Sequence, residues 1–234
     1  MFFPSDKLPQ GDPLVIVLLG KTGNGKSASG NTIIGEERFE DSPSGESMTQ
    51  VCTMQRRREE RVVSVIDTPG ITDTAPVSAL AKIKASVQYN QSQEQIIREL
   101  HRMFVLSPNG LDAIILTIKY GGRFTVEDAE ALKMLQSFLG KEANAHMILL
   151  FTHGDQAARD AKKKKRSVED HLKWYIETLP EWVQVFLKEI GDRRILFNNV
   201  LDPDEDPDGC KRQVIELIKV RKCFPNAAYI HCEA

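Results

Sequence analysis

The feature that most constrains the fold is the segment GKTGNGKS at residues 20–27, which directly follows the apolar run LVIVLL. This G-x-x-x-x-G-K-S pattern is specific when it lies between a buried strand and a helix. Its glycines let backbone N–H groups surround phosphates at the start of that helix. The apolar run predicts the strand, and residues 27–34 predict the helix. A glycine-rich turn that arose by chance would need all three features to coincide, so we expect a phosphate-binding loop.

Short runs of β-branched residues and leucine recur along the chain, and each is followed by a helical or turn segment. The predicted strands are residues 14–19, 62–66, 113–118, 147–151 and 195–197, with a possible extra strand at 51–57. The predicted helices are residues 27–34, 93–105, 126–139, 168–178 and 209–222. This alternation predicts an α/β fold with a largely parallel sheet and helices on both faces.

Two residues are predicted helix N-caps because a suitable partner follows three positions later, as in a capping box. They are Ser92 with Gln95, and Thr125 with Asp128. Residues 40–50 and 71–91 are rich in turn formers and are expected to be loops. Both border the phosphate site, where ligand-dependent ordering would matter.

The phosphate loop supplies most of the candidate cofactor-binding residues. They are Gly20, Lys21, Thr22, Gly23, Asn24, Gly25, Lys26, Ser27 and Ala28. Lys26 is expected to neutralise the β- and γ-phosphates and so to take part in catalysis, while the Ser27 hydroxyl would ligate Mg²⁺. Asp67 ends the strand VVSVID, where open α/β sheets bind ligands, and is expected to hold Mg²⁺ through water. The Gly70 N–H would meet the γ-phosphate.

A threonine that covers Mg²⁺ in the triphosphate state is expected between these two motifs. Thr49 is the candidate, as a metal ligand and catalytic residue, and Thr53 competes with it. An ordinary loop or strand threonine is the alternative for either position.

The segment THGD, which follows the strand MILLF, predicts the base that is recognised. Asp155 can accept hydrogen bonds from guanine N1–H and the 2-amino group, a pattern that adenine does not offer. Thr152 and His153 complete the motif, and the imidazole replaces the usual lysine beside the base. Asn198 or Asn199 could reach guanine O6. An ATPase or kinase is therefore disfavoured.

Composition excludes some classes of partner. The formal net charge is -2 and the sequence pI about 6.2, which argues against nucleic acid or an anionic membrane as the main partner. The four cysteines lack CxxC spacing and fit reduced intracellular thiols. With no signal-like N-terminus or spanning apolar run, a cytoplasmic protein is expected, attached to membranes only through segments outside this chain.

In order along the chain, these motifs resemble the septin-like GTPases of the immunity-associated GIMAP type, and more weakly the chloroplast-import GTPases. The resemblance rests on GKTGNGKSASGNTIIGEERF, SMTQVC, VIDTPGITDT, GGRFTVEDAEALKMLQSFLG, ILLFTHGD and LFNN. It implies a guanine-nucleotide domain over residues 14–222 with a mainly parallel six-stranded sheet. Residues 1–13 would be a flexible lead-in and 223–234 a C-terminal tail, with truncation of a longer chain left open.

Hydrolysis is the open question, because Ile71 stands where GTPases usually carry a water-orienting glutamine. Slow turnover is expected from a lone domain. The resemblance implies homodimers that pair through the nucleotide face, with Arg123 as an arginine finger supplied in trans. Two alternatives remain: Arg123 is a solvated loop residue or forms only a dimer salt bridge, and the protein is a GTP-gated oligomeric scaffold with negligible hydrolysis.

Overall fold

The computed structural model describes residues 11–40, 49, 51–58, 61–70, 91–201 and 206–221. Within these residues six strands form one sheet in the order β2-β3-β1-β4-β5-β6. They are β1 (Leu14–Gly20), β2 (Thr53–Arg58), β3 (Val62–Asp67), β4 (Ala113–Lys119), β5 (Met147–Thr152) and β6 (Arg194–Leu196). The β2–β3 pair is antiparallel and the other pairs are parallel. The predicted α/β fold with a mainly parallel sheet is confirmed.

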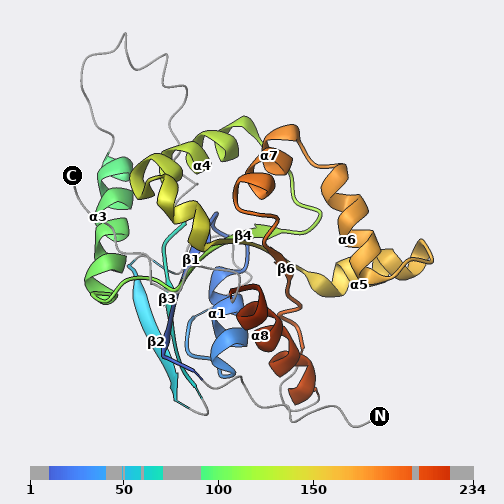
Figure 1. The fold of residues 1–234 in the computed structure, drawn as a ribbon, viewed down its shortest axis with the longest axis horizontal. Coiled ribbons are helices and arrows are strands. Elements are labelled where there is room, and N and C mark those ends of the chain that lie inside the picture. Colours follow the sequence, from blue (N-terminus) through green and yellow to red (C-terminus); the bar gives the residue numbers. More distant parts are fainter. Residues whose placement is uncertain are drawn as a thin grey trace.

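Helices cover both faces of this sheet (Figure 1). They are α1 (Lys26–Ile34), α3 (Gln91–Leu106), α4 (Val126–Leu139), α5 (Gly154–Lys163), α6 (Val168–Glu177), α7 (Glu181–Glu189) and α8 (Pro207–Arg221), with a short 3₁₀ helix, η1 (Lys141–His146). Helices α1 and α8 lie on one face, and α3, α4 and α7 on the other. No helix in the described part of the chain is long and apolar enough to cross a bilayer.

The sheet has two apolar cores because successive strand residues point to opposite faces. In β1, Val17 and Leu19 belong to the core beneath α3, α4 and α7, whereas Ile16 and Leu18 belong to the core beneath α1 and α8. Burial of both faces explains why the strands are continuous apolar runs rather than alternating ones.

The helix-cap predictions had different outcomes. Thr125 caps α4, and its reciprocal hydrogen bonds with Asp128 form the predicted capping box. The prediction for Ser92 is wrong, because Ser92 is the second residue of α3. The predicted loops and the two terminal segments fall largely outside the described residues. Of the cysteines, Cys52 and Cys210 are buried free thiols, as expected.

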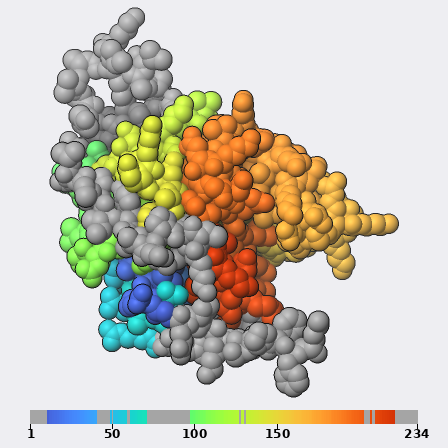
Figure 2. Space-filling model, viewed as in Figure 1, coloured from blue at the N-terminus to red at the C-terminus, as the bar shows by residue number. Residues whose placement is uncertain are grey.

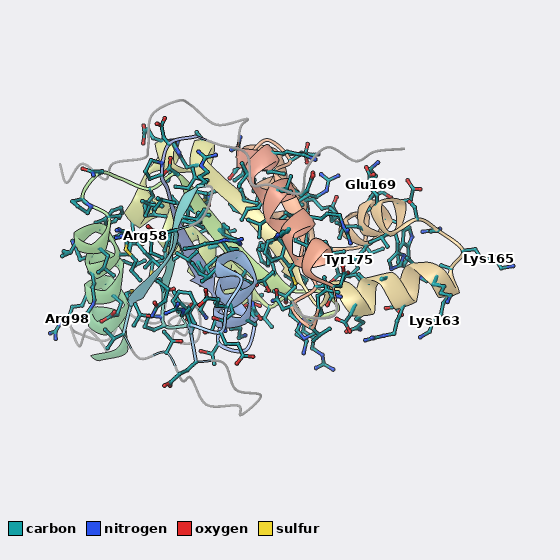
Figure 3. All side chains as sticks on the ribbon, turned by 90° about the horizontal axis from the view of Figure 1, so that it is seen from below. Arg58, Arg98, Lys163, Lys165, Glu169 and Tyr175 are labelled. Atoms are coloured by element: carbon teal, nitrogen blue, oxygen red, sulfur yellow. The ribbon has the colours of Figure 1, made fainter. Side chains whose placement is uncertain are left out.

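The sequence analysis missed η1, α5 and α7. Helices α5 and α6 form a hairpin that projects from the body of the molecule (Figure 2). The basic run at residues 162–166 ends α5 and forms the turn of this hairpin, where Lys163 and Lys165 point outward (Figure 3). At the start of α8, the Asp206 carboxylate accepts the Gly209 N–H at 2.8 Å and so caps this helix.

Candidate nucleotide-binding site

The loop between β1 and α1 is fastened to the two neighbouring strands. The Asn24 side chain donates to the Thr117 carbonyl at 2.9 Å, and the Thr152 hydroxyl donates to the Asn24 carbonyl at 3.0 Å. Gly20 approaches β4 so closely that a Cβ atom there would lie 2.5 Å from the Thr117 carbonyl oxygen. Only glycine fits this position without a shift of the backbone, so the sheet itself fixes the shape of the loop.

The start of α1 presents a favourable site for an anion. Gly25 occupies the N-cap position and provides no side-chain hydrogen bond, and the first turn contains no acidic residue. The first N–H groups of a helix lack intrahelical acceptors, and the helix dipole favours negative charge there. Lys26 is buried beside them, with its ammonium group donating to the Lys21 carbonyl at 3.1 Å. This end of α1 can hold phosphate groups.

The three predicted magnesium ligands lie together. The Ser27 hydroxyl donates to Asp67 Oδ2 at 2.6 Å, and the Thr49 hydroxyl donates to the same oxygen at 3.0 Å. The Ser27 and Thr49 oxygens are 3.3 Å apart. Thr53 pairs with Asp67 in the β2–β3 register, but it is exposed and makes none of these contacts. The geometry therefore favours Thr49 over Thr53.

The Asp67 carboxylate has unused ligand capacity. Only 1% of Asp67 is exposed, and its Oδ1 atom has no hydrogen-bond partner among the described residues. Burial raises the pKa of Asp67, and the Ser27 hydrogen bond and the Lys26 charge oppose that effect. A divalent cation beside the carboxylate would satisfy Oδ1 and favour the charged form. An oxygen cluster of two hydroxyls and one carboxylate suits Mg²⁺.

The predicted base-recognition residues follow β5 at the same edge of the sheet. His153 adopts a left-handed conformation with φ 61°, and the Gly154 N–H donates to the Phe197 carbonyl at 2.8 Å. Burial and the Lys119 charge lower the pKa of His153, which favours a neutral imidazole. Asp155 lies in the first turn of α5, and its carboxylate pairs with Arg159 at 2.7 Å.

The two asparagines after β6 have different environments. The Asn199 side chain donates to the Ser29 hydroxyl at 2.9 Å and accepts the Thr32 hydroxyl at 3.0 Å, so it ties the loop to α1. The Asn198 side-chain oxygen accepts the Val200 N–H, and no described residue hydrogen-bonds its amino group. Asn198 therefore keeps a polar group for a ligand, whereas the side-chain amide of Asn199 is committed to the fold.

Arg123 lies in the loop between β4 and α4. It is exposed, and among the described residues it has no ion pair or hydrogen bond. It lines a cavity together with Gly20, Lys21 and Asn24, so it stands beside the phosphate loop. Gly70 lies three residues after Asp67, the last residue of β3, whereas Ile71 lies outside the described residues.

Sequence reasoning missed one link in this site. The Asp128 carboxylate, predicted only as part of a helix cap, also pairs with the Lys21 ammonium group at 3.4 Å. The sequence carries no signal for this contact, because it depends on how α4 lies against the phosphate loop.

Comparison with known proteins gives this site a family context. The model of the AIG1 family matches residues 14–229, which is nearly the whole chain. The chain belongs to the AIG1 family. Relatives of this AIG1 chain in Arabidopsis thaliana include immune-associated nucleotide-binding proteins 13 and 8. The first is 31% identical over 208 residues and the second 32% identical over 220 residues, covering 88% and 92% of this chain.

These relatives are longer than the AIG1 chain described here. The matches cover 54% and 55% of the two proteins, so the chain spans about half of their length. The expected resemblance to the immunity-associated GTPases is confirmed.

Solved structures confirm that the AIG1 chain has a P-loop GTPase fold. Toc33 from Arabidopsis thaliana, in complex with GDP and Mg²⁺, superposes with a TM-score of 0.67 at 20% identity, covering 95% of this chain and 89% of Toc33. Era from Aquifex aeolicus, bound to GDP and AlF4-, superposes with a TM-score of 0.52 at 14% identity, covering 93% of this chain and 58% of the Era chain.

Proposed function

We propose that this protein binds GTP and GDP with Mg²⁺ and hydrolyses GTP slowly, and that nucleotide-dependent homodimerisation stimulates hydrolysis. The observation that carries the proposal is the cluster of Ser27, Thr49 and Asp67, with hydroxyl-to-carboxylate distances of 2.6 and 3.0 Å. This cluster lies next to buried Lys26 at the sheet edge that also bears Asp155.

In this proposal the loop residues 20–28 hold the phosphates through their N–H groups and Lys26. Ser27, Thr49 and Asp67 would hold Mg²⁺, which neutralises charge on the phosphate oxygens when it is bound. Gly70 would contact the γ-phosphate. Toc33, a structural neighbour, was solved with GDP and Mg²⁺ and with Mg²⁺ and GMPPNP, which supports this choice of ligands.

Guanine selectivity is assigned to Asp155, with Thr152 and His153 shaping the pocket and Asn198 offering its amino group to guanine O6. A neutral imidazole at His153 can pack on the base without adding a second cation to the site. The names of the relatives, immune-associated nucleotide-binding proteins, support a nucleotide ligand.

Arg123 is proposed to act on the phosphates of a second copy. Its exposure and its position beside the phosphate loop suit a residue that reaches across a dimer, and such an arginine can raise a rate by about 10³- to 10⁵-fold. Two Toc33 structures support the idea for a related fold. One is the structure of a dimerization-deficient mutant of Toc33 in which an arginine is replaced by alanine. The other accompanies the finding that dimerization is important for the GTPase activity of atToc33 and psToc159.

The second candidate function is a GTP-gated scaffold with negligible hydrolysis. The observation that favours it is Ile71, whose side chain cannot orient a water molecule. In this case GTP would control assembly, and Arg123 would contribute only to the dimer interface.

Turnover measured across protein concentrations tests both candidates. GTP hydrolysis per molecule would be measured for the wild type, Arg123→Ala and Arg166→Ala, with GDP affinity measured in parallel. Arg166 is an exposed control arginine on the projecting hairpin. We expect specific activity to rise with concentration in the wild type and control and to collapse in Arg123→Ala, while GDP still binds. Activity per molecule that is independent of concentration in all three would contradict the dimer mechanism.

A further inference from the structure

Lys21 links the phosphate lysine to the loop that carries Arg123, through its backbone carbonyl on one side and its ammonium group on the other. The Lys26 ammonium donates to the Lys21 carbonyl at 3.1 Å, and the Lys21 ammonium pairs with Asp128 Oδ1 at 3.4 Å. The other carboxylate oxygen, Asp128 Oδ2, accepts the Thr125 N–H at 2.9 Å and the Thr125 hydroxyl at 3.2 Å. One carboxylate is thus shared between the phosphate loop and the residue two positions after Arg123.

The loop between β4 and α4 depends on polar contacts at its ends. At its first end, Gly121 has φ 72° and donates its N–H to the Tyr175 hydroxyl at 2.9 Å. At its second end, the contacts of Asp128 with Thr125 hold the backbone. Between them the apolar packing is incomplete, because a cavity of about 70 Å³ lies against this loop and the adjoining α4 and α7.

The side chains around this cavity make an aromatic contact between the loop and α7. Phe124 meets Trp182 edge to face with ring centroids 5.9 Å apart, and both rings line the cavity. Unfilled space on one side removes part of the dispersion contacts that fix a side chain. With part of this packing missing, the polar contacts at the two ends of the loop contribute to the position of Arg123.

We propose that Asp128 is a positioning residue that couples phosphate binding at Lys26 to the placement of Arg123 for a second copy of the chain. This inference rests on the proposed function. When phosphates bind, the Lys26 ammonium is shared between them and the Lys21 carbonyl, and Lys21 transmits the change to Asp128. Since Thr125 is bound by the same carboxylate, the Arg123 loop adopts its dimer-competent position when the phosphate loop is filled.

A purely structural role for Asp128 makes a different prediction. Asparagine retains a side-chain oxygen for the Thr125 N–H, so Asp128→Asn keeps the cap acceptor and removes only the charge that pairs with Lys21. If Asp128 serves the cap alone, this variant behaves as the wild type. If Asp128 couples the two loops, the variant loses dimer-dependent properties while the monomer still binds nucleotide.

The experiment compares the wild type with Asp128→Asn, Lys21→Gln and the double variant. The matched control is Glu169→Gln, which breaks the exposed Glu169–Lys173 pair, 3.0 Å long, on the projecting hairpin. For each protein, sedimentation with a non-hydrolysable GTP analogue gives the dimer dissociation constant. Turnover at saturating protein, GDP affinity of the dilute monomer and the melting temperature complete the set.

We expect Asp128→Asn to weaken the dimer and lower its turnover by about five- to ten-fold each, the low end of measured coupling between sites. Its GDP affinity and melting temperature should match those of Glu169→Gln. The double variant should be no worse in dimerisation than Asp128→Asn, because both changes remove one interaction. Wild-type dimerisation and turnover in Asp128→Asn would overturn the inference, as would additive losses in the double variant.

Arg123→Ala separates a failure of this inference from a failure of the proposed function. If Arg123→Ala leaves turnover unchanged, the proposed dimer mechanism fails and the coupling fails with it. If Arg123→Ala abolishes the stimulated turnover while Asp128→Asn behaves as the wild type, only the role of Asp128 is wrong.

Discussion

Asp155 is the residue to which we assign base selectivity. Its carboxylate is only partly exposed and pairs with Arg159 at 2.7 Å, so it is held at the start of α5. We predict that Asp155→Asn loses affinity for GDP by about 100-fold, because two hydrogen bonds from guanine N1–H and the 2-amino group are lost or reversed. The asparagine amide can instead donate to the 2-oxo group of xanthine, so affinity for xanthosine diphosphate should rise.

Competition binding with the two diphosphates measures this exchange of specificity. Arg159→Ala is the control, since it removes the ion-pair partner of Asp155 and leaves the carboxylate that we propose contacts the base. Its preference for GDP should persist. An Asp155→Asn variant that still prefers GDP over xanthosine diphosphate would show that another group reads the base.

At the residue scale, motifs in the sequence predicted most residues of the candidate site but not every contact between them. Ser27 and Asp67 could be predicted because each follows a buried strand in a recognisable pattern, and their hydrogen bond of 2.6 Å agrees with that placement. The sequence could not decide between Asn198 and Asn199. The choice depends on which of the two side-chain amides is hydrogen-bonded by residues of α1. Asp128 was found only as a cap residue for the same kind of reason.

At the element scale, two of the missed helices, α5 and α7, differ in how well the sequence could have revealed them. Helix α7 (EWVQVFLKE) buries Val183, Phe186 and Leu187, which is the spacing of one helix face and could have been found. Helix α5 (GDQAARDAKK) buries only Gly154, Ala157 and Ala161. These residues also share one helix face, but they are small and the segment is strongly polar overall, so it lacks the large apolar side chains that predict a packed helix.

Helix α6 is joined to the end of β4 by a buried polar contact that should make stability depend on pH. His171 is 1% exposed, and its Nε2 atom lies 2.7 Å from the Tyr120 hydroxyl. Burial lowers the pKa of His171, with a further contribution from Lys164 and Arg166 that Asp160 opposes. Burial also raises the pKa of Tyr120 to about 12, so its hydroxyl remains protonated.

The sign of the effect follows from proton binding. An unfolded histidine has a pKa of about 6.5, and the folded value is lower, so the unfolded state binds more protons as the pH falls below this value. Stability is present above the unfolded pKa and is lost as the pH falls towards the folded pKa. We predict that the free energy of unfolding decreases as the pH falls from about 7.5 to about 5.5, and that this decrease is larger in the wild type than in His171→Gln.

Urea denaturation at the two pH values tests this prediction. The pKa of His153 is also lowered by burial, but His153 is present in both proteins, so the comparison isolates His171. His171→Gln is expected to be less stable at both pH values because it alters a buried contact. Only the difference in pH dependence bears on the prediction, and equal dependence in the two proteins would contradict it.

At the scale of the whole molecule, the strand order brings the site together. Residues from the ends of β1, β3, β4, β5 and β6 meet at one edge because these strands are parallel neighbours in the sheet. This gathering follows from the topology, which the family resemblance implied and which no single motif contains. Arg123 stands at the same edge, exposed and without an ion pair or hydrogen bond among the described residues.

If Arg123 acts in trans, two inactive variants should restore each other. Arg123→Ala keeps its own GTP site, whereas Asp155→Asn keeps Arg123 and is expected to accept a non-hydrolysable xanthosine triphosphate analogue. With that analogue and GTP present, neither variant alone should hydrolyse GTP at the stimulated rate. In the mixture, a heterodimer places Arg123 of the Asp155→Asn variant at the GTP bound to the Arg123→Ala variant, so turnover should return.

The control partner is the double variant Arg123→Ala/Asp155→Asn, which should restore nothing. Restoration by that double variant would mean that filling the second site is sufficient, and no restoration by either partner would mean that Arg123 acts within its own chain or not at all.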